Sequence, residues 1–124
     1  MKIYESAENY LEAILILGKE EEHVRSIDIA RQLRFSKPSV SVAMKQLKDN
    51  GYTDIYDGGK ITLTQTGFEI ASRMYERHTI LTNILVSLGV DEETAKTDAC
   101  RIEHDISGKS FEMIKKHVQQ HMNK

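Results

Sequence analysis

The chain has 124 residues, of which 40% are hydrophobic and 29% are charged, and its formal net charge at pH 7 is −2. This length suits one compact domain or two small units, and the composition argues against a disordered chain. A single cysteine excludes an internal disulfide framework and a four-cysteine zinc site. No apolar run approaches the roughly 20 residues of a membrane-spanning helix. Acidic residues stand where a signal peptide has its apolar core, so we expect a cytoplasmic protein.

The first half of the chain carries a helical hydrophobic pattern. Apolar residues at helical spacing predict a first helix over residues 6–19, a short second helix capped by Ser26, and a third helix capped by Ser36. Pro38 falls in the first turn of the third helix, where its missing N–H costs nothing. Asn50 and Gly51 predict the end of that helix.

Beyond Gly51 the pattern changes to that of a β-hairpin. Residues 52–56 and 61–64 are rich in β-branched and aromatic side chains, and residues 57–60 predict the turn between them. A helix of roughly two dozen residues follows, and its length favours a scaffold or dimerisation role. Asp91 caps a shorter helix predicted to run through Ile102, and a last helix is expected from Lys109 toward His121.

Helix, turn, helix and hairpin, in this order between residues 26 and 64, are typical of a winged helix-turn-helix. Seven basic and four acidic residues give positions 25–60 a net charge of +3, whereas the rest of the chain carries −5. The alternative is a small α+β core whose lysines are simply solvated, but element order, turn chemistry and local charge together favour DNA binding. The residues expected to contact DNA are Arg25, Ser36, Lys37, Pro38, Ser39, Ser41, Lys45, Gly59 and Lys60.

A second constellation consists of Cys100, Glu103 and His104. Positions i, i+3 and i+4 share one face of a helix, so a thiolate, a carboxylate and an imidazole point the same way. Such a mixed ligand set suits a divalent first-row transition metal and is unlike the all-oxygen shell of Mg²⁺ or Ca²⁺. The alternative is a buried structural cysteine beside a surface Glu-His pair.

Several segments occur in the order found in one known family: residues 8–14, 26–33, 36–41, 61–67 and 98–104, together with Arg77-His78. Over nearly its whole length the chain resembles the diphtheria toxin repressor (DtxR/MntR) family of metal-dependent transcriptional repressors. The resemblance implies a mostly α fold, with an N-terminal winged helix-turn-helix in residues 1–70 and a helical dimerisation and metal-binding domain in residues 71–124. It also implies a homodimer.

By the same resemblance, the chain is expected to repress metal homeostasis genes in response to Fe²⁺ or Mn²⁺, on a pseudo-palindromic double-stranded DNA operator. The metal ligands that it implies are Asn9, Glu12, His78, Cys100, Glu103 and His104.

Four positions depart from the usual pattern of that family. Asn9 stands where members usually have Met or Asp, and Cys100 stands where the manganese-selective branch tends to have an acid. Thr82 and Lys96 stand where iron-responsive members have secondary ligands. Because thiolate suits the softer ions, we expect Fe²⁺ as the first cofactor and Mn²⁺ as the second.

Other classes of function stay open from the sequence alone. The main alternative is a winged-helix regulator that responds to a small molecule or to oxidation of Cys100. A second alternative is a metalloenzyme that uses Glu103 and His104, but this function would not explain the winged helix. A third is a winged-helix dimer used only for protein contacts, which would not bind an operator. We expect no catalytic residues and no enzyme activity.

Overall fold

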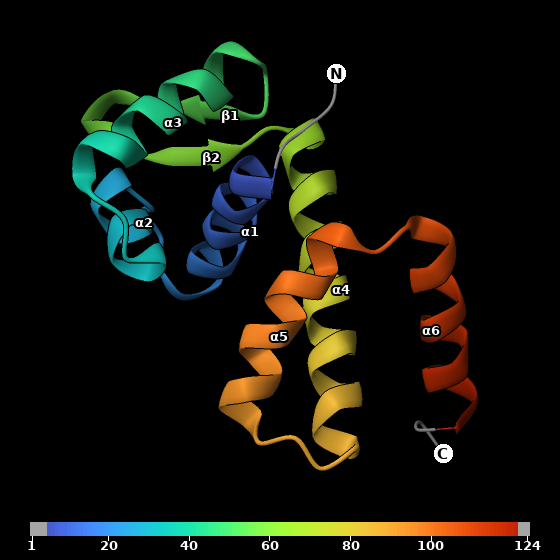
Figure 1. Cartoon of the computed structure of the whole chain (residues 1–124). Coiled ribbons are helices and arrows are strands. Elements are labelled where there is room, and N and C mark those ends of the chain that lie inside the picture. Colours follow the sequence, from blue (N-terminus) through green and yellow to red (C-terminus); the bar gives the residue numbers. More distant parts are fainter. Residues whose placement is uncertain (1–4, 122–124) are drawn as a thin grey trace. The chain divides into compact units, whose positions relative to one another are not determined.

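The computed structural model describes residues 5–121, and over this range it is mostly helical, as the sequence predicts (Figure 1). The elements are α1 Glu5–Glu20, α2 Ser26–Leu33, α3 Lys37–Asp49, β1 Thr53–Ile55, a 3-10 turn Asp57–Gly59, β2 Ile61–Leu63, α4 Gln65–Ser87, α5 Glu92–Asp105 and α6 Gly108–His121. They form two compact units, the first ending at Arg73 and the second beginning at Met74. Among the described residues, no helix combines the length and apolar character needed to cross a membrane.

Two predicted helix caps are confirmed. The backbone N–H of Ser39 donates to the Ser36 hydroxyl at 3.3 Å, at the start of α3, and Pro38 lies in the first turn. At the start of α5 the backbone N–H of Thr94 donates to the Asp91 carboxylate at 3.0 Å. This hydrogen bond lowers the pKa of the Asp91 carboxyl, because it stabilises the charged form.

The start of α2 differs from the prediction. Ser26, the expected cap, is the first helical residue, and Arg25 before it has an extended backbone. The backbone N–H of Arg25 donates to the Asp28 carboxylate at 3.0 Å. The prediction was therefore wrong by one residue, since an acid three positions into a helix reaches back to the residue that precedes it. Two helices are also longer than predicted. Helix α1 spans Glu5–Glu20 where residues 6–19 were expected, and α5 continues to Asp105 beyond the expected end at Ile102.

The first unit surrounds one hydrophobic core. Fully or nearly fully buried side chains of α1, α2 and α3 meet there: Leu11, Ile29, Val40 and Met44. The two strands pair antiparallel, with Asp54 opposite Thr62. They form the predicted hairpin, whose tip is exposed.

The junction between the hairpin and α4 depends on Gly67. The backbone N–H of Gly67 donates to the Thr64 hydroxyl at 3.2 Å, and that hydroxyl donates to the carbonyl of Gly51 at 2.7 Å. A β-carbon on Gly67 would overlap the backbone carbonyl of Tyr52. Because Gly67 has no side chain, the first turn of α4 can lie against the backbone of Tyr52, the residue before β1.

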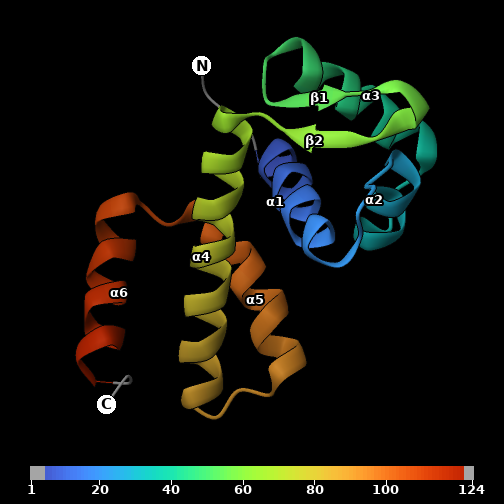
Figure 2. The ribbon, with the colours of Figure 1, turned by 180° about the vertical axis from the view of Figure 1, so that it is seen from behind.

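In the second unit, α5 and α6 lie on opposite sides of α4, as two views from opposite directions agree (Figures 1 and 2). Ala95 and Ala99 of α5 are fully buried. On the other side, Phe111 of α6 is buried, and Lys115 pairs with Glu76 of α4 at 3.2 Å. Small side chains on α5 allow this helix to approach α4 closely.

Candidate nucleic-acid interface and metal centre

Helix α3 has a buried side and an exposed side. Val40, Met44 and Leu47 hold the helix to the core of the first unit. The predicted DNA contacts on this helix and at its cap are all exposed: Ser36, Lys37, Pro38, Ser39, Ser41 and Lys45. This surface therefore presents hydroxyl groups and the Lys37 ammonium group at the start of a helix, where phosphate oxygens are favoured partners, and the Lys45 ammonium group farther along the same helix.

The hydroxyl groups at this helix start are already ordered. The Ser36 hydroxyl donates to Ser39 Oγ at 2.8 Å while it accepts from the Ser39 backbone. Both side chains are exposed, so their remaining hydrogen-bonding capacity faces solvent.

The other predicted DNA contacts lie outside α3. Arg25 precedes α2 and is exposed, and Gly59 is exposed at the tip of the hairpin with a φ of 83°. Lys60 is half-buried and lines a groove of about 410 Å³ together with Glu21 and Glu22. Lys60 is thus less exposed than the other predicted cations, Arg25, Lys37 and Lys45.

In the second unit, α5 brings Cys100, Glu103 and His104 together as their spacing predicts. Each side chain offers one ligand atom, and these atoms all lie within 4.8 Å of one another. Two atoms that bind one ion at about 2.0–2.3 Å are at most about 4.6 Å apart. A small side-chain adjustment therefore lets the three residues share a metal ion.

His78 reaches the same place from α4. Its Nδ1 lies 3.2 Å from one carboxylate oxygen of Glu103, and His104 Nε2 lies 3.4 Å from the other. We refer to His78, Cys100, Glu103 and His104 as the candidate metal centre. Residues from two helices of one unit thus converge on a single carboxylate.

Glu103 is the informative member of this group. Its side chain is 0% exposed, yet neither carboxylate oxygen makes a hydrogen bond within residues 5–121, and the same holds for Nδ1 of His78. The ring nitrogens of His78 and His104 are near, but neither is hydrogen-bonded to this carboxylate. A buried carboxylate without hydrogen bonds is costly unless a cation compensates it. The donor set of sulfur, nitrogen and oxygen atoms fits a divalent transition metal.

Arg77 holds the end of α5 that carries this carboxylate, and sequence reasoning missed its role. One guanidinium nitrogen donates to the backbone carbonyls of Glu103 at 2.9 Å and Ile106 at 3.0 Å. The guanidinium also lies over the ring of Phe111, 5.3 Å from its centre. The only signal in the sequence was its position beside His78, and nothing local indicates carbonyl partners 26 and 29 residues away.

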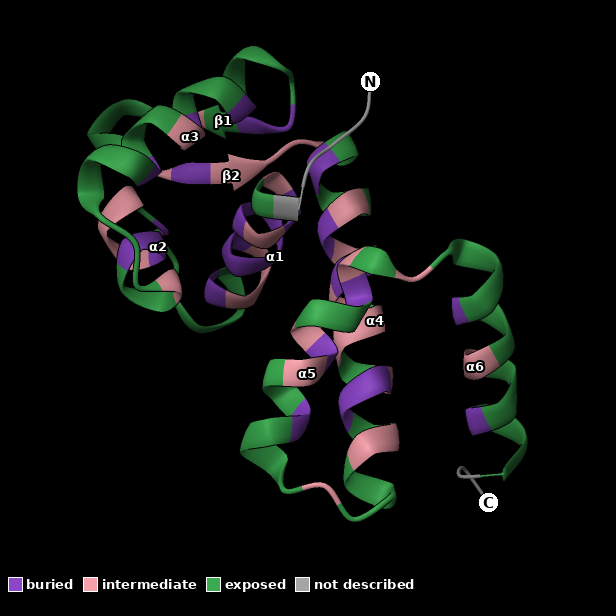
Figure 3. Cartoon of the chain, viewed as in Figure 1, coloured by how far each residue is buried: buried purple, intermediate pink, exposed green. Residues whose placement is uncertain are grey.

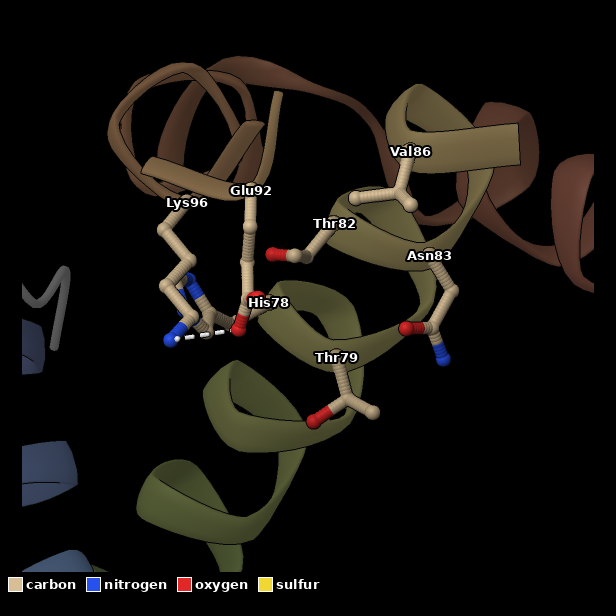
Figure 4. Close-up of a pocket in the computed structure, with 7 residues that line it drawn as sticks. All are labelled: His78, Thr79, Thr82, Asn83, Val86, Glu92 and Lys96. Atoms are coloured by element: carbon tan, nitrogen blue, oxygen red, sulfur yellow. Dashed lines mark ion pairs between the residues drawn. The ribbon is translucent and has the colours of Figure 1, made fainter. Parts of the chain in front are cut away.

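A pocket of about 310 Å³ opens beside His78, between α4 and α5 (Figure 4). Thr82 points into it toward α5 and is buried, and its hydroxyl makes no hydrogen bond among the described residues. Lys96 pairs with Glu92 at 3.1 Å on the other wall. A hydroxyl is a weak metal ligand and an ammonium is none, so Thr82 and Lys96 add no ligand to the candidate metal centre.

The remaining predicted ligands, Asn9 and Glu12, belong to the first unit. They lie on α1 at positions i and i+3, so they share one face of that helix.

Comparisons with known proteins cover almost the whole chain. Residues 2–58 match the family model described as iron dependent repressor, N-terminal DNA binding domain. Residues 64–123 match the model described as iron dependent repressor, metal binding and dimerisation domain.

Two curated relatives illustrate the similarity. The transcriptional regulator MntR of Escherichia coli is 32% identical over 117 residues, which are 94% of this chain and 76% of the relative. The regulator MntR of Bacillus subtilis is 36% identical over 110 residues, 88% of this chain and 77% of the relative. A solved manganese-dependent transcriptional repressor in complex with manganese superposes with a TM-score of 0.84 at 26% identity, over 91% of this chain and 52% of that one. The chain therefore spans about half the length of that solved repressor.

Proposed function

Because the chain belongs to the DtxR/MntR family of metal-dependent, DNA-binding transcriptional repressors, we propose that it senses a divalent metal ion and then represses genes of metal homeostasis. The observation that carries this proposal is the buried Glu103 carboxylate, whose oxygens face His78 and His104 without a hydrogen bond. Since its target is an operator, we propose that it acts in the cytoplasm.

His78, Cys100, Glu103 and His104 are the residues that would hold the ion, and we propose Asn9 and Glu12 as further ligands. The last two assignments rest on the sequence resemblance and on their shared helix face. When bound, the ion supplies a positive charge that compensates Glu103 and cross-links the helices that carry its ligands. Ligands from both units would make the ion favour one arrangement of the units, and operator affinity changes only as far as the arrangements differ in affinity.

We propose Fe²⁺ as the first cofactor and Mn²⁺ as the second. The argument is the sulfur ligand: Cys100 is half-buried within the candidate metal centre, and thiolate favours softer ions than carboxylate does. The solved relative is named for manganese, so a ranking with Mn²⁺ first is the competing result. Such a ranking would refute the softness argument and leave the repressor function intact.

Residues 64–123 match a metal binding and dimerisation domain, so we propose that the chain binds DNA as a homodimer. We propose that two copies of α3 enter successive major grooves about 34 Å apart, or a multiple of this distance, on a pseudo-palindromic operator. Lys37, Lys45 and the α3 hydroxyl groups would contact phosphates, together with Arg25 and the wing residues Gly59 and Lys60.

The test is an anaerobic DNA-binding titration of the full-length chain at fixed salt, with fragments of its own genome and with Fe²⁺, Mn²⁺, Zn²⁺ or a chelator. We expect at least tenfold tighter operator binding with metal, reversed by chelator, which corresponds to about 1.4 kcal/mol of coupling. Glu103→Gln keeps the size of the side chain and removes its charge, and it should abolish the response. His23→Ala, in an exposed loop, is the matched control and should respond like the wild type.

Operator binding that ignores every ion would overturn the proposal. In that case, loss of DNA binding on peroxide treatment, prevented by Cys100→Ala, would support the alternative of a redox-responsive regulator.

A further inference from the structure

The outer helix of the second unit carries two histidines that the candidate metal centre does not use. His117 and His121 lie one turn apart on α6, and their ring centres are 4.4 Å apart with 38° between the ring planes. Both residues are exposed, and most of the surface of α6 is open to solvent (Figure 3). None of the four residues of the candidate metal centre lies on α6.

Two imidazoles at positions i and i+4 of a helix can bind one metal ion together, because both project from the same face. Ring nitrogens that share an ion at about 2.0–2.1 Å are separated by about 3 to 4 Å. Ring centres 4.4 Å apart bring the nitrogens to this separation after small side-chain rotations. The helix therefore already holds the pair close to chelating geometry.

The surroundings indicate which ions such a pair prefers. Met113 lies one turn before His117 and is 58% exposed, and these two residues line an apolar groove of about 380 Å³. A thioether next to one of the two imidazoles favours soft and borderline ions. The nearby Lys115 is paired with Glu76 at 3.2 Å, which offsets one of the positive charges next to the pair.

We propose that His117 and His121 form a second, surface metal site for divalent ions at the upper end of the Irving–Williams order: Cu²⁺, Ni²⁺ and Zn²⁺. Two neutral ligands without a carboxylate bind Mn²⁺ and Fe²⁺ much more weakly, since these ions stand at the lower end of that order. The number of ions per chain then depends on the metal. Mn²⁺ fills the candidate metal centre alone, whereas Cu²⁺ or Ni²⁺ also occupies α6.

The experiment uses the full-length chain without a histidine tag and counts bound ions by equilibrium dialysis with Ni²⁺ and with Mn²⁺. A background variant, Glu103→Gln with His104→Ala, removes the candidate metal centre. In this background we expect one Ni²⁺ per chain, and His117→Ala or His121→Ala should each weaken its binding at least tenfold. His23→Ala is the matched control and should leave it unchanged.

Two further measurements show whether the loss of Ni²⁺ binding in these variants comes from the α6 site itself, and not from misfolding or from the candidate metal centre. Wild-type chain and His117→Ala should bind Mn²⁺ equally and show the same helicity by circular dichroism. Bound Cu²⁺ in the background variant should show two nitrogen couplings by electron paramagnetic resonance, reduced to one by His121→Ala. No Ni²⁺ binding in the background variant, or binding that survives both histidine substitutions, would overturn the proposal without affecting the repressor function.

Discussion

Replacing Arg77 with Met tests whether the candidate metal centre depends on a residue that binds no metal. The substitution removes two hydrogen bonds from a charged donor to the carbonyls of Glu103 and Ile106, and the cation–π contact with Phe111. Each such hydrogen bond contributes about 1.5–3 kcal/mol, and the cation–π contact about 0.5–1 kcal/mol. Methionine retains apolar packing against Phe111 and recovers about 0.5 kcal/mol.

At the lower end of these ranges the net loss is about 3 kcal/mol of unfolding free energy. A domain of ordinary stability has about 5–15 kcal/mol in total, so Arg77→Met should still fold at low temperature. Because the two lost hydrogen bonds hold the turn of α5 that carries Glu103, we expect about half of this loss to appear in metal binding. That fraction corresponds to about tenfold weaker affinity.

The assay is urea denaturation of the metal-free chain, followed by a metal titration under conditions where the variant is folded. Arg77→Lys retains a cation that reaches one carbonyl, and it should lose about half as much stability. Metal affinity equal to that of the wild type in folded Arg77→Met would show that α5 is positioned without Arg77 and would refute this reasoning.

Three other predictions concern the rest of the chain. Gly67→Ala introduces a β-carbon that overlaps the carbonyl of Tyr52, and it should cost about 2–3 kcal/mol of stability by thermal denaturation. Gly18→Ala, in a helix with open space around it, should be neutral or stabilising, and equal effects of the two would contradict the steric argument. Lys37→Ala should weaken binding to all DNA sequences alike and reduce the slope of log affinity against log salt by about one unit, measured by titration at several salt concentrations. The pKa of the Asp91 carboxyl is lower in the folded protein than its ordinary value of 3.8. The charged carboxylate therefore stabilises α5 fully at pH values above 3.8, and this stabilisation is lost as the pH falls through the lower pKa of the folded state. Asp91→Ala should therefore flatten the acid limb of a stability–pH profile, and an unchanged limb would refute this assignment.

Much of the first unit could be predicted because its signals are local. Ser36 and Pro38 specify the start of α3 within one turn, and Gly51 has the left-handed backbone that ends it, with a φ of 82°. The hairpin follows from alternating strand residues around a glycine-containing turn. The error at the start of α2 has the same local origin, since Ser26 and Asp28 are both good partners for a helix start.

The sequence by itself also determined the triad of Cys100, Glu103 and His104, because helical periodicity alone puts these positions on one face. The family resemblance already implied His78 as a further ligand, but only the tertiary structure decided that Glu103 is fully buried, how near His78 of another helix lies to it, and that Arg77 holds the carbonyls beside it. Each of these contacts joins residues about 25 or more positions apart. Their distances depend on how α4 and α5 pack, and no pattern within one helix carries that information.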